Sequence, residues 1–379
     1  GRKIVWNIGF RGQGDLPVWE NDPSFDTQKK RGELIAGLIR EQYDLVKRQD
    51  ANAVCCTNLY GEAMELYRAG VLAIPSDVIV IWADNGYGKM VSRRQGNHNP
   101  RVFALPTQDG AGAHGIYYHV SFYDLQAANH ITMCGNSPEF IKNELTKVFL
   151  AGADQYWIIN CSNVKPHVYL LDLIAGLWKN RELDIERHRK QYCREYYGED
   201  AFVRVACCLG RYAEYAASYG KNEDEHAGEQ FFNHPARILI SQYMKDKSQP
   251  ANEMRWAVDC DTLRDQVTWY KNICQHSAER YQAFAKECEQ TMNALSGNGK
   301  RLFEDSILLQ ARLYLHCSRG AGLICAAILE AFDGSYQRAF YYSGKAKKEY
   351  LCADMAMRSS EHGKWKGFYA NECLTDIKQ

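Results

Sequence analysis

The chain has 379 residues, which exceeds the length at which one hydrophobic core usually keeps growing, so two domains are expected. Its 46 basic and 46 acidic residues give a formal net charge of zero and leave no basic block, which argues against a nucleic-acid partner. No apolar run approaches the roughly 20 residues that cross a bilayer, so no membrane partner is expected either.

Aromatic and cysteine residues narrow the class of protein further. The 24 Tyr and 8 Trp residues suit a sugar-binding cleft as well as an ordinary core. None of the 14 cysteines stands in a Cys-x-x-Cys pair, which disfavours a zinc site or a disulfide framework, and we expect no metal and no cofactor. Scattered reduced thiols indicate a cytoplasmic protein, with a secreted or periplasmic location as the alternative for a longer precursor.

Five short apolar runs, rich in β-branched and aromatic residues, predict β-strands in the first 165 residues. Each run ends in polar side chains, and stretches with helical periodicity, such as residues 31–48, lie between them. The predicted strands are residues 4–10, 53–57, 78–82, 115–119 and 155–160. Strands that alternate with helices pair in parallel through right-handed crossovers, as in a barrel or a doubly wound sheet.

The strand ends favour the barrel. No Gly-x-Gly-x-x-Gly dinucleotide fingerprint follows any strand, whereas nearly every strand ends in ionisable or amide side chains, as at the active-site end of a barrel. Strand signals cease near residue 173, and long helical stretches follow at 185–197, 202–219, 261–295 and 303–332. The sequence therefore predicts an α/β fold, with part of a (β/α)8 TIM-type barrel at residues 1–172 and an all-α helical domain at residues 173–379.

The first two strand ends carry charged residues with two interpretations each. Arg11 and Asp15 follow the first strand, either as a structural loop pair or as a carboxylate-gripping cation beside an acid that activates water. Glu62 opens an amphipathic helix after the second strand, where it either complements the helix N-terminus or serves as an acid.

The other three strand ends are less specific when each is taken alone. Asp84 and Asn85 end the third strand in a Gly-rich stretch that also suits a plain turn. His119 ends the fourth strand, where a lone His is more often a core residue than a catalyst. Asn160 ends the fifth strand, shortly before Lys165. Five such clusters at successive strand ends are harder to explain as turns and core residues alone.

Five motifs, in this order, resemble the barrel motifs of glycoside hydrolase family 115, the xylan α-1,2-glucuronidases: NIGFRGQGD, LYGEAMELYRAG, IPSDVIVIWADNGYG, GAGAHGIYYHVSF and WIINCSNVKPHVY. GKWKGFYANECL, at residues 363–374, resembles the end of that family's helical domain. The resemblance implies that the five strands are the fourth to eighth of the barrel and that a preceding barrel segment of the same protein is missing. Strands 4–10 and 155–160 are then expected to border a gap, with exposed apolar faces, rather than to pair with each other.

The resemblance also implies an inverting hydrolase that removes (4-O-methyl)glucuronic acid branches from xylan, a polysaccharide or oligosaccharide substrate, with two carboxylates. Motif by motif, Glu62 matches the essential glutamate and is assigned as the acid. Asp15 matches the essential aspartate and is assigned as the base, with Asp84 in reserve. The implied substrate-binding residues are Arg11, Tyr60, Trp82, Asn85, Tyr118, His119, Asn160 and Lys165.

Two departures from the family pattern bear on the substrate. The stretch at residues 84–88 lacks the second acid, and Ser162 and Asn163 stand where the family has Gly-Asp. A divergent glycosidase acting on another glycan and a non-catalytic carbohydrate-binding relic are therefore alternatives, and a homodimer is left open. The polar run at residues 223–234, which contains His226, Glu229 and His234, is interpreted as a solvated helix boundary rather than as part of a cleft.

Overall fold

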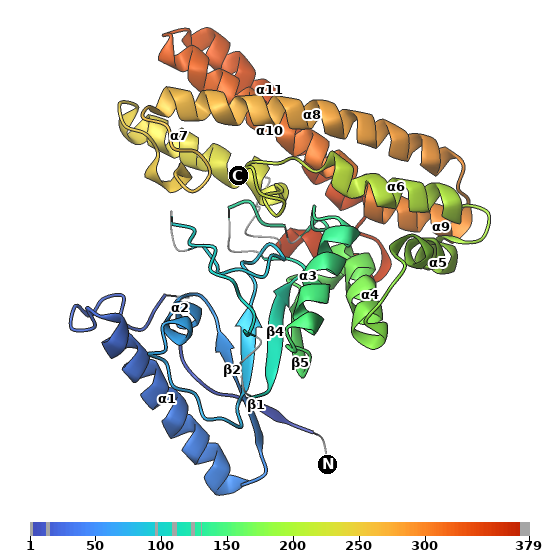
Figure 1. Cartoon of the computed structure of the whole chain (residues 1–379). Coiled ribbons are helices and arrows are strands. Elements are labelled where there is room, and N and C mark those ends of the chain that lie inside the picture. The colour runs from blue at the N-terminus through green and yellow to red at the C-terminus, as the bar shows by residue number, and fades with distance from the viewer. Residues whose placement is uncertain are drawn as a thin grey trace. The chain divides into compact units, whose positions relative to one another are not determined.

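The computed structural model describes residues 3–12, 16–94, 98–107, 112–122, 126–129 and 131–371 (Figure 1). Contacts divide the chain into two compact units. The barrel unit comprises residues 1–119 and 142–160, and the helical unit comprises residues 120–141 and 161–379. The sequence predicts one boundary at residue 172, whereas the segment that follows the fourth strand groups with the helices.

Five parallel strands form one open sheet in the order β1-β2-β3-β4-β5. The strands are β1 (Val5–Asn7), β2 (Val54–Leu59), β3 (Ile79–Ala83), β4 (His114–His119) and β5 (Tyr156–Asn160). All five predicted strands and their parallel pairing are confirmed. Strands β1 and β5 form the two edges and do not pair with each other, so the sheet is the predicted part of a barrel rather than a small closed one.

Both edges of the sheet expose apolar side chains. Around β1, Ile4 is 60% exposed, Trp6 48% and Phe10 53%. All five residues of β5 are half-buried, whereas most residues of the central strands β3 and β4 are buried. The predicted apolar exposure at the edge strands is therefore present in the structure.

Helices in the barrel unit follow the strands, as βα units require. Helix α1 (Gln28–Gln49) connects β1 to β2, α2 (Glu62–Arg68) follows β2, and α3 (Pro138–Leu150) precedes β5. Helix α1 begins three residues before the predicted stretch because the Thr27 hydroxyl caps it, accepting a hydrogen bond from the Lys30 backbone N–H. Its apolar face buries Ile35 and Ile39.

The helical unit is built around α10 (Leu309–Phe332), which packs against α8 (Leu263–Asn293) and α11 (Tyr336–Ser359) (Figure 1). Helices are present in all four predicted helical stretches, although the one predicted at 202–219 ends at Tyr215. The other elements are α4 (Val164–Asn180), α5 (Ile185–Tyr197), α6 (Phe202–Tyr215), η2 (Glu229–Phe232), α7 (His234–Asp246), η3 (Asn252–Met254), α9 (Gly297–Phe303), the π-helical turn η4 (Glu304–Leu308), η5 (Gly363–Trp365) and η6 (Phe368–Asn371).

One helical stretch among the described residues, Gly297–Phe332, is long and apolar enough by length and composition to cross a membrane. Half of its apolar window is buried inside the structure. The central helix of a helical core meets the same criteria, and α10 has that place in this unit.

Candidate functional site

The carboxyl ends of β2 to β5 bring several predicted residues onto one face of the sheet. Side chains alternate between the two faces of a strand, so Tyr117 and His119 share a face, and the register sets His119 opposite Asn160. The ring centroids of Tyr117 and His119 lie 4.6 Å apart, and those of Tyr60 and Tyr117 lie 6.0 Å apart. Asn160 Nδ2 donates a hydrogen bond to Tyr117 Oη at 2.5 Å. These four side chains form a continuous row across the strand ends.

Arg11 and Glu62 form a bidentate ion pair beside this row. Arg11 Nε donates to Glu62 Oε2 at 3.1 Å, and Arg11 Nη2 donates to Glu62 Oε1 at 2.8 Å. The guanidinium carbon of Arg11 also lies 5.3 Å from the ring centroid of Tyr60. The Glu62 side chain is 18% exposed, so solvent or a substrate reaches a carboxylate whose direction is set by the guanidinium fork.

A second arginine, Arg93, lies against the same tyrosine. Arg93 Nη1 donates a hydrogen bond to Tyr60 Oη at 2.7 Å, and its guanidinium carbon is 5.2 Å from the ring centroid. Two guanidinium groups thus flank one aromatic ring near one carboxylate. A guanidinium group is shaped to bind a carboxylate through two parallel hydrogen bonds.

Asp84 lies at the end of β3 and is fully buried. Asp84 Oδ1 accepts hydrogen bonds from the Gly86 backbone N–H at 3.0 Å and from His119 Nδ1. Asp84 Oδ2 accepts from the backbone N–H groups of Gly88 at 2.9 Å and His119 at 3.0 Å. Four donors therefore hold this carboxylate, and it in turn sets the orientation of the His119 ring.

The loop from Asp84 to Arg93 is held by short-range and long-range hydrogen bonds. Gly86 and Gly88 have φ angles of +87° and +78°, in the left-handed region that favours glycine. From α3, Glu144 accepts hydrogen bonds from Lys89 Nζ at 2.9 Å and from the Met90 backbone N–H at 3.0 Å. These hydrogen bonds therefore hold the loop that carries Arg93 in place.

We expect Glu144→Gln to destabilise the fold by about 1.5–3 kcal/mol near neutral pH, the usual contribution of hydrogen bonds to a charged group. Burial alone would raise the pKa of Glu144, but hydrogen bonds from Lys147, the Met90 backbone and Lys89 hold that pKa below its ordinary value of 4.5. The stabilisation is therefore complete above pH 4.5 and is lost as pH falls through the folded-state pKa.

Urea unfolding of both proteins between about pH 7 and pH 3 measures this difference. The two free energies of unfolding should converge in acid, because protonated Glu144 has lost most of its advantage over glutamine. Glu139→Gln, an exposed position on the same helix, is the control and should change little at any pH. A Glu144→Gln loss that stays constant down to the acid end of this range would contradict the role given to the ionised carboxylate.

Two predicted binding residues lie on the other face of the sheet. Trp82 is 1% exposed, donates to His114 Nδ1 at 3.2 Å, and packs edge-on against Tyr67 of α2 at 5.6 Å. Tyr118 is also 1% exposed and alternates with its neighbours Tyr117 and His119. Neither Trp82 nor Tyr118 belongs to the row at the strand ends.

Asn85 and Asp15 complete the barrel-unit candidates. Asn85 is 4% exposed, and its Oδ1 accepts the backbone N–H groups of Tyr87 at 3.0 Å and Lys89 at 3.3 Å, which is the role of a turn residue. Asp15, the predicted base, lies outside the described residues.

Lys165 belongs to the helical unit, whereas the other candidates belong to the barrel unit. It is the second residue of α4, and its Nζ donates to Tyr369 Oη at 3.3 Å. Burial lowers the pKa of Lys165, against the opposing effect of Asp305 and Glu361. A charged lysine in this position is only partly compensated by its surroundings.

Most of the polar run at residues 223–234 is buried, so its interpretation as a solvated boundary is wrong. Asp224 is 2% exposed and Glu229 is fully buried. Glu229 accepts hydrogen bonds from the Ile131 backbone N–H at 3.2 Å and from Thr132 Oγ1. The run is polar because it satisfies the backbone and side chains of the segment after β4, which a solvated boundary would not need to do.

Two residues of the strand-end cluster are absent from the sequence-based prediction. Tyr117 contacts Tyr60, His119 and Asn160, and its signal was available, because it stands two residues before His119 and strand residues two apart share a face. Arg93 lies in a loop outside the strand-end motifs, where no periodicity indicates its direction.

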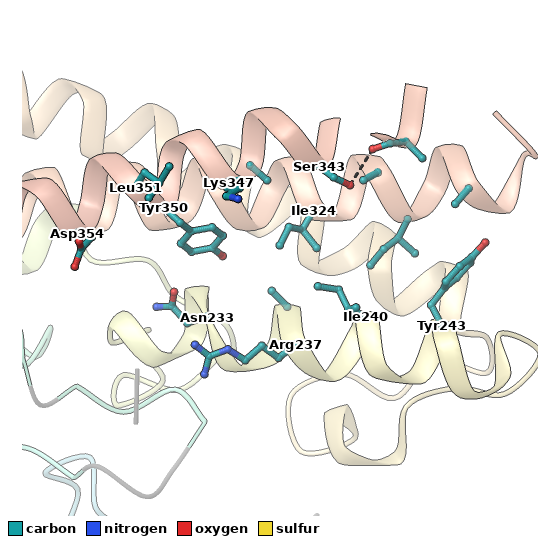
Figure 2. A pocket seen from close by; sticks show the side chains of 16 residues that line it. Asn233, Arg237, Ile240, Tyr243, Ile324, Ser343, Lys347, Tyr350, Leu351 and Asp354 are labelled. Carbon is teal, nitrogen blue, oxygen red and sulfur yellow. Dashed lines mark hydrogen bonds between the residues drawn. The ribbon is translucent and has the colours of Figure 1, made fainter. Parts of the chain in front are cut away.

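A cavity of about 510 Å³ lies in the helical unit, between α7 and α11 and against α10 (Figure 2). Alanine, isoleucine and leucine form most of its wall, and no predicted site residue lines it. Asp354 is the single carboxylate among its lining residues, whereas glycoside hydrolysis generally uses two. The strand-end cluster therefore remains the candidate site.

Comparisons with known proteins identify the family and the fold of this chain. The family model described as Glycosyl hydrolase family 115 matches residues 1–223, more than half of the chain. A GH115 4-O-methyl-α-glucuronidase with specificity for decorated arabinogalactans matches in structure with a TM-score of 0.63 and 18% identity, over 100% of this chain and 45% of its own. A GH138 enzyme that targets pectin rhamnogalacturonan II matches with a TM-score of 0.51 and 8% identity, over 93% of this chain and 44% of its own.

At these identities the structural likeness shows the fold alone. The chain spans less than half the length of either of these structures. Curated protein sequences give no match.

Proposed function

This chain belongs to glycosyl hydrolase family 115, and we propose that the intact protein removes (4-O-methyl)glucuronic acid branches from a polysaccharide with inversion at the anomeric carbon. The observation that carries the proposal is the bidentate Arg11–Glu62 pair beside the aromatic row at the strand ends. It combines an accessible carboxylate with cations that suit a uronate.

The proposed reaction uses two carboxylates from the barrel unit. Glu62 donates a proton to the leaving glycosidic oxygen, and Asp15 takes a proton from the attacking water. An inverting enzyme leaves about 6.5–9.5 Å between the two carboxyl groups, so that water fits between the base and the sugar. His119, held by Asp84, and Asn160 supply hydrogen bonds to the sugar in this proposal.

The ion pair with Arg11 restricts when Glu62 can act as an acid. Both oxygens of Glu62 accept hydrogen bonds from the Arg11 guanidinium, so in this arrangement they are directed at Arg11 rather than at the leaving oxygen. We therefore propose that the uronate carboxylate of the substrate replaces Glu62 at Arg11, after which Glu62 takes up a proton from solvent water and turns to the leaving oxygen. A neutral sugar does not displace Glu62 from Arg11, so selectivity for uronates would appear in kcat as well as in KM.

Steady-state kinetics of the intact protein with a 4-nitrophenyl α-D-glucuronide and the matching α-D-glucoside test this proposal. We expect wild type to favour the glucuronide by at least about tenfold in kcat/KM, and Arg11→Ala to lose most of that preference. Arg40→Ala, at an exposed position on α1, is the matched control because it removes an arginine far along the chain from every strand-end motif. A preference that survives Arg11→Ala would overturn the exchange, and equal rates in wild type would overturn the uronate assignment.

A different acceptor glycan is the second candidate. The missing second acid at residues 84–88 and the Ser162–Asn163 replacement favour it, because fewer acids change the polar surroundings of the site. Aldouronic acids from xylan and a decorated arabinogalactan, the substrate class named for one structural relative, distinguish the acceptors. Proton NMR of the sugar first released reports whether the anomeric configuration is inverted.

A further inference from the structure

The cavity between α7 and α11 lies wholly within the helical unit, and the barrel chemistry gives it no role. Its volume of about 510 Å³ is in the usual range of small-molecule sites, which is roughly 300–1,000 Å³. Figure 2 shows Ile240 and Ile324 toward one end of the cavity. Asn233, Arg237 and Tyr350 lie toward the other end. An apolar end and a polar end are typical of a site that orients its ligand.

Asn233, immediately before α7, carries a buried acceptor at the polar end. The residue is 3% exposed, and its Nδ2 donates a hydrogen bond to the Glu229 backbone carbonyl at 2.6 Å. Because a carbonyl only accepts hydrogen bonds, this contact fixes the orientation of the amide. Figure 2 shows the amide oxygen on the side that faces α11. Within the described ranges Oδ1 accepts no hydrogen bond, and native proteins leave few buried acceptors in that state, so this oxygen indicates a ligand with a donor.

The charges that line the cavity limit the head group of such a ligand. They belong to Arg237, Lys347 and Asp354. Nε and Nη2 of Arg358 each lie 3.1 Å from Asp354 Oδ1, so the one carboxylate of the lining is compensated from outside it. The lining is therefore positive on balance, which disfavours a cationic ligand.

The acceptor at Asn233 disfavours a carboxylate head as well. Carboxylate oxygens only accept hydrogen bonds, so they would leave Asn233 Oδ1 unpaired. A hydroxyl group both donates and accepts. It can donate to Asn233 Oδ1 while its oxygen accepts from Arg237, whose guanidinium has several N–H donors. The rings of Tyr243 and Tyr350 in the lining favour an aromatic ring behind this hydroxyl.

We propose that this cavity binds an uncharged phenol that carries an apolar substituent. The phenolic O–H donates to Asn233 Oδ1, and the phenolic oxygen accepts from Arg237. The substituent lies along Ile240 and Ile324, where its burial supplies most of the affinity. This inference concerns the helical unit alone and is independent of the proposed function.

Isothermal titration calorimetry of the intact protein with 4-butylphenol and 4-butylanisole tests the head group. The two molecules share the ring and the butyl chain, but the methyl ether has no hydrogen to donate. At neutral pH we expect 4-butylphenol to bind at a single site and 4-butylanisole to bind about tenfold more weakly, the loss that a missing hydrogen bond causes. Equal affinities, or no binding of 4-butylphenol, would overturn the proposal.

Filling the cavity tests its location. Ala339→Phe adds a ring to the lining from α11 and should weaken the binding of 4-butylphenol at least about tenfold, because the ring takes up the space of the ligand. Ala356→Phe, at another half-buried alanine of α11 outside the lining, is the matched control and should keep the wild-type affinity. An Ala339→Phe variant that does not fold by circular dichroism is replaced by Ser343→Phe, at an exposed lining position, with the exposed Ser359→Phe as its control. Wild-type affinity in the folded lining variant, or an equal loss in its control, overturns the assignment to this cavity.

Discussion

Glu62→Gln is expected to lower kcat on xylan-derived aldouronic acids by about 10²–10⁴-fold, the usual contribution of a general acid. Glutamine preserves the size of the side chain and still offers Arg11 one carbonyl oxygen. It cannot transfer a proton to the leaving oxygen. Because Arg11 also keeps its contact with Tyr60, the fold should survive and KM should change much less than kcat.

The leaving group distinguishes an acid from a base. A 2,4-dinitrophenyl glucuronide leaves without protonation, so Glu62→Gln should retain most of the wild-type rate on it if Glu62 is the acid. Glu33→Gln, at an exposed position on α1, is the matched control and should behave as wild type on both substrates. Equal losses on the activated and the natural substrate would assign Glu62 a different role, such as the base.

The strands could be predicted from the sequence because their signal is local. Each run of β-branched and aromatic residues between polar ends, such as residues 78–82, is its own evidence for a strand, and alternation with helices implies parallel pairing. Helix ends were harder to predict, since they depend on individual contacts. Gly297 starts α9 between two of the predicted helical stretches, 261–295 and 303–332, and η4 then joins α9 to α10 through a π-helical turn.

The candidate site was only partly predictable because its contacts are long-range. Motif order indicated Arg11, Glu62 and the strand ends, but not that Arg11 grips Glu62, since their proximity depends on β1 pairing with β2. The face of each side chain follows from strand register, which separates Tyr118 from His119. The burial of residues 223–234 depends on partners about a hundred residues away in the chain.

Replacing Asp84 with asparagine is expected to destabilise the protein by about 3–5 kcal/mol, the usual cost of removing one partner from a buried charged network. Each oxygen of Asp84 accepts two donors, from Gly86 and the His119 ring on one side and from Gly88 and the His119 backbone on the other. An amide has one oxygen. In one orientation its NH₂ group meets the backbone N–H groups of Gly88 and His119, and in the other it meets the Gly86 backbone N–H beside the His119 ring nitrogen, so at least one donor loses its acceptor in a buried region.

Urea denaturation near neutral pH checks this prediction. Measuring kcat on the fraction that stays folded then distinguishes a structural role of Asp84 from a role in proton transfer. Asp77→Asn, at the other end of β3 and 49% exposed, is the control, because exposed ion pairs contribute about 0–1 kcal/mol. A large loss of stability from Asp84→Asn, beside a small one from Asp77→Asn, supports Asp84 as the residue that orients His119 and shapes the loop to Arg93. If Asp84→Asn instead keeps wild-type stability and loses turnover, then Asp84 exchanges a proton during the reaction. Asp84, the alternative to Asp15 in the sequence analysis, would then be the base.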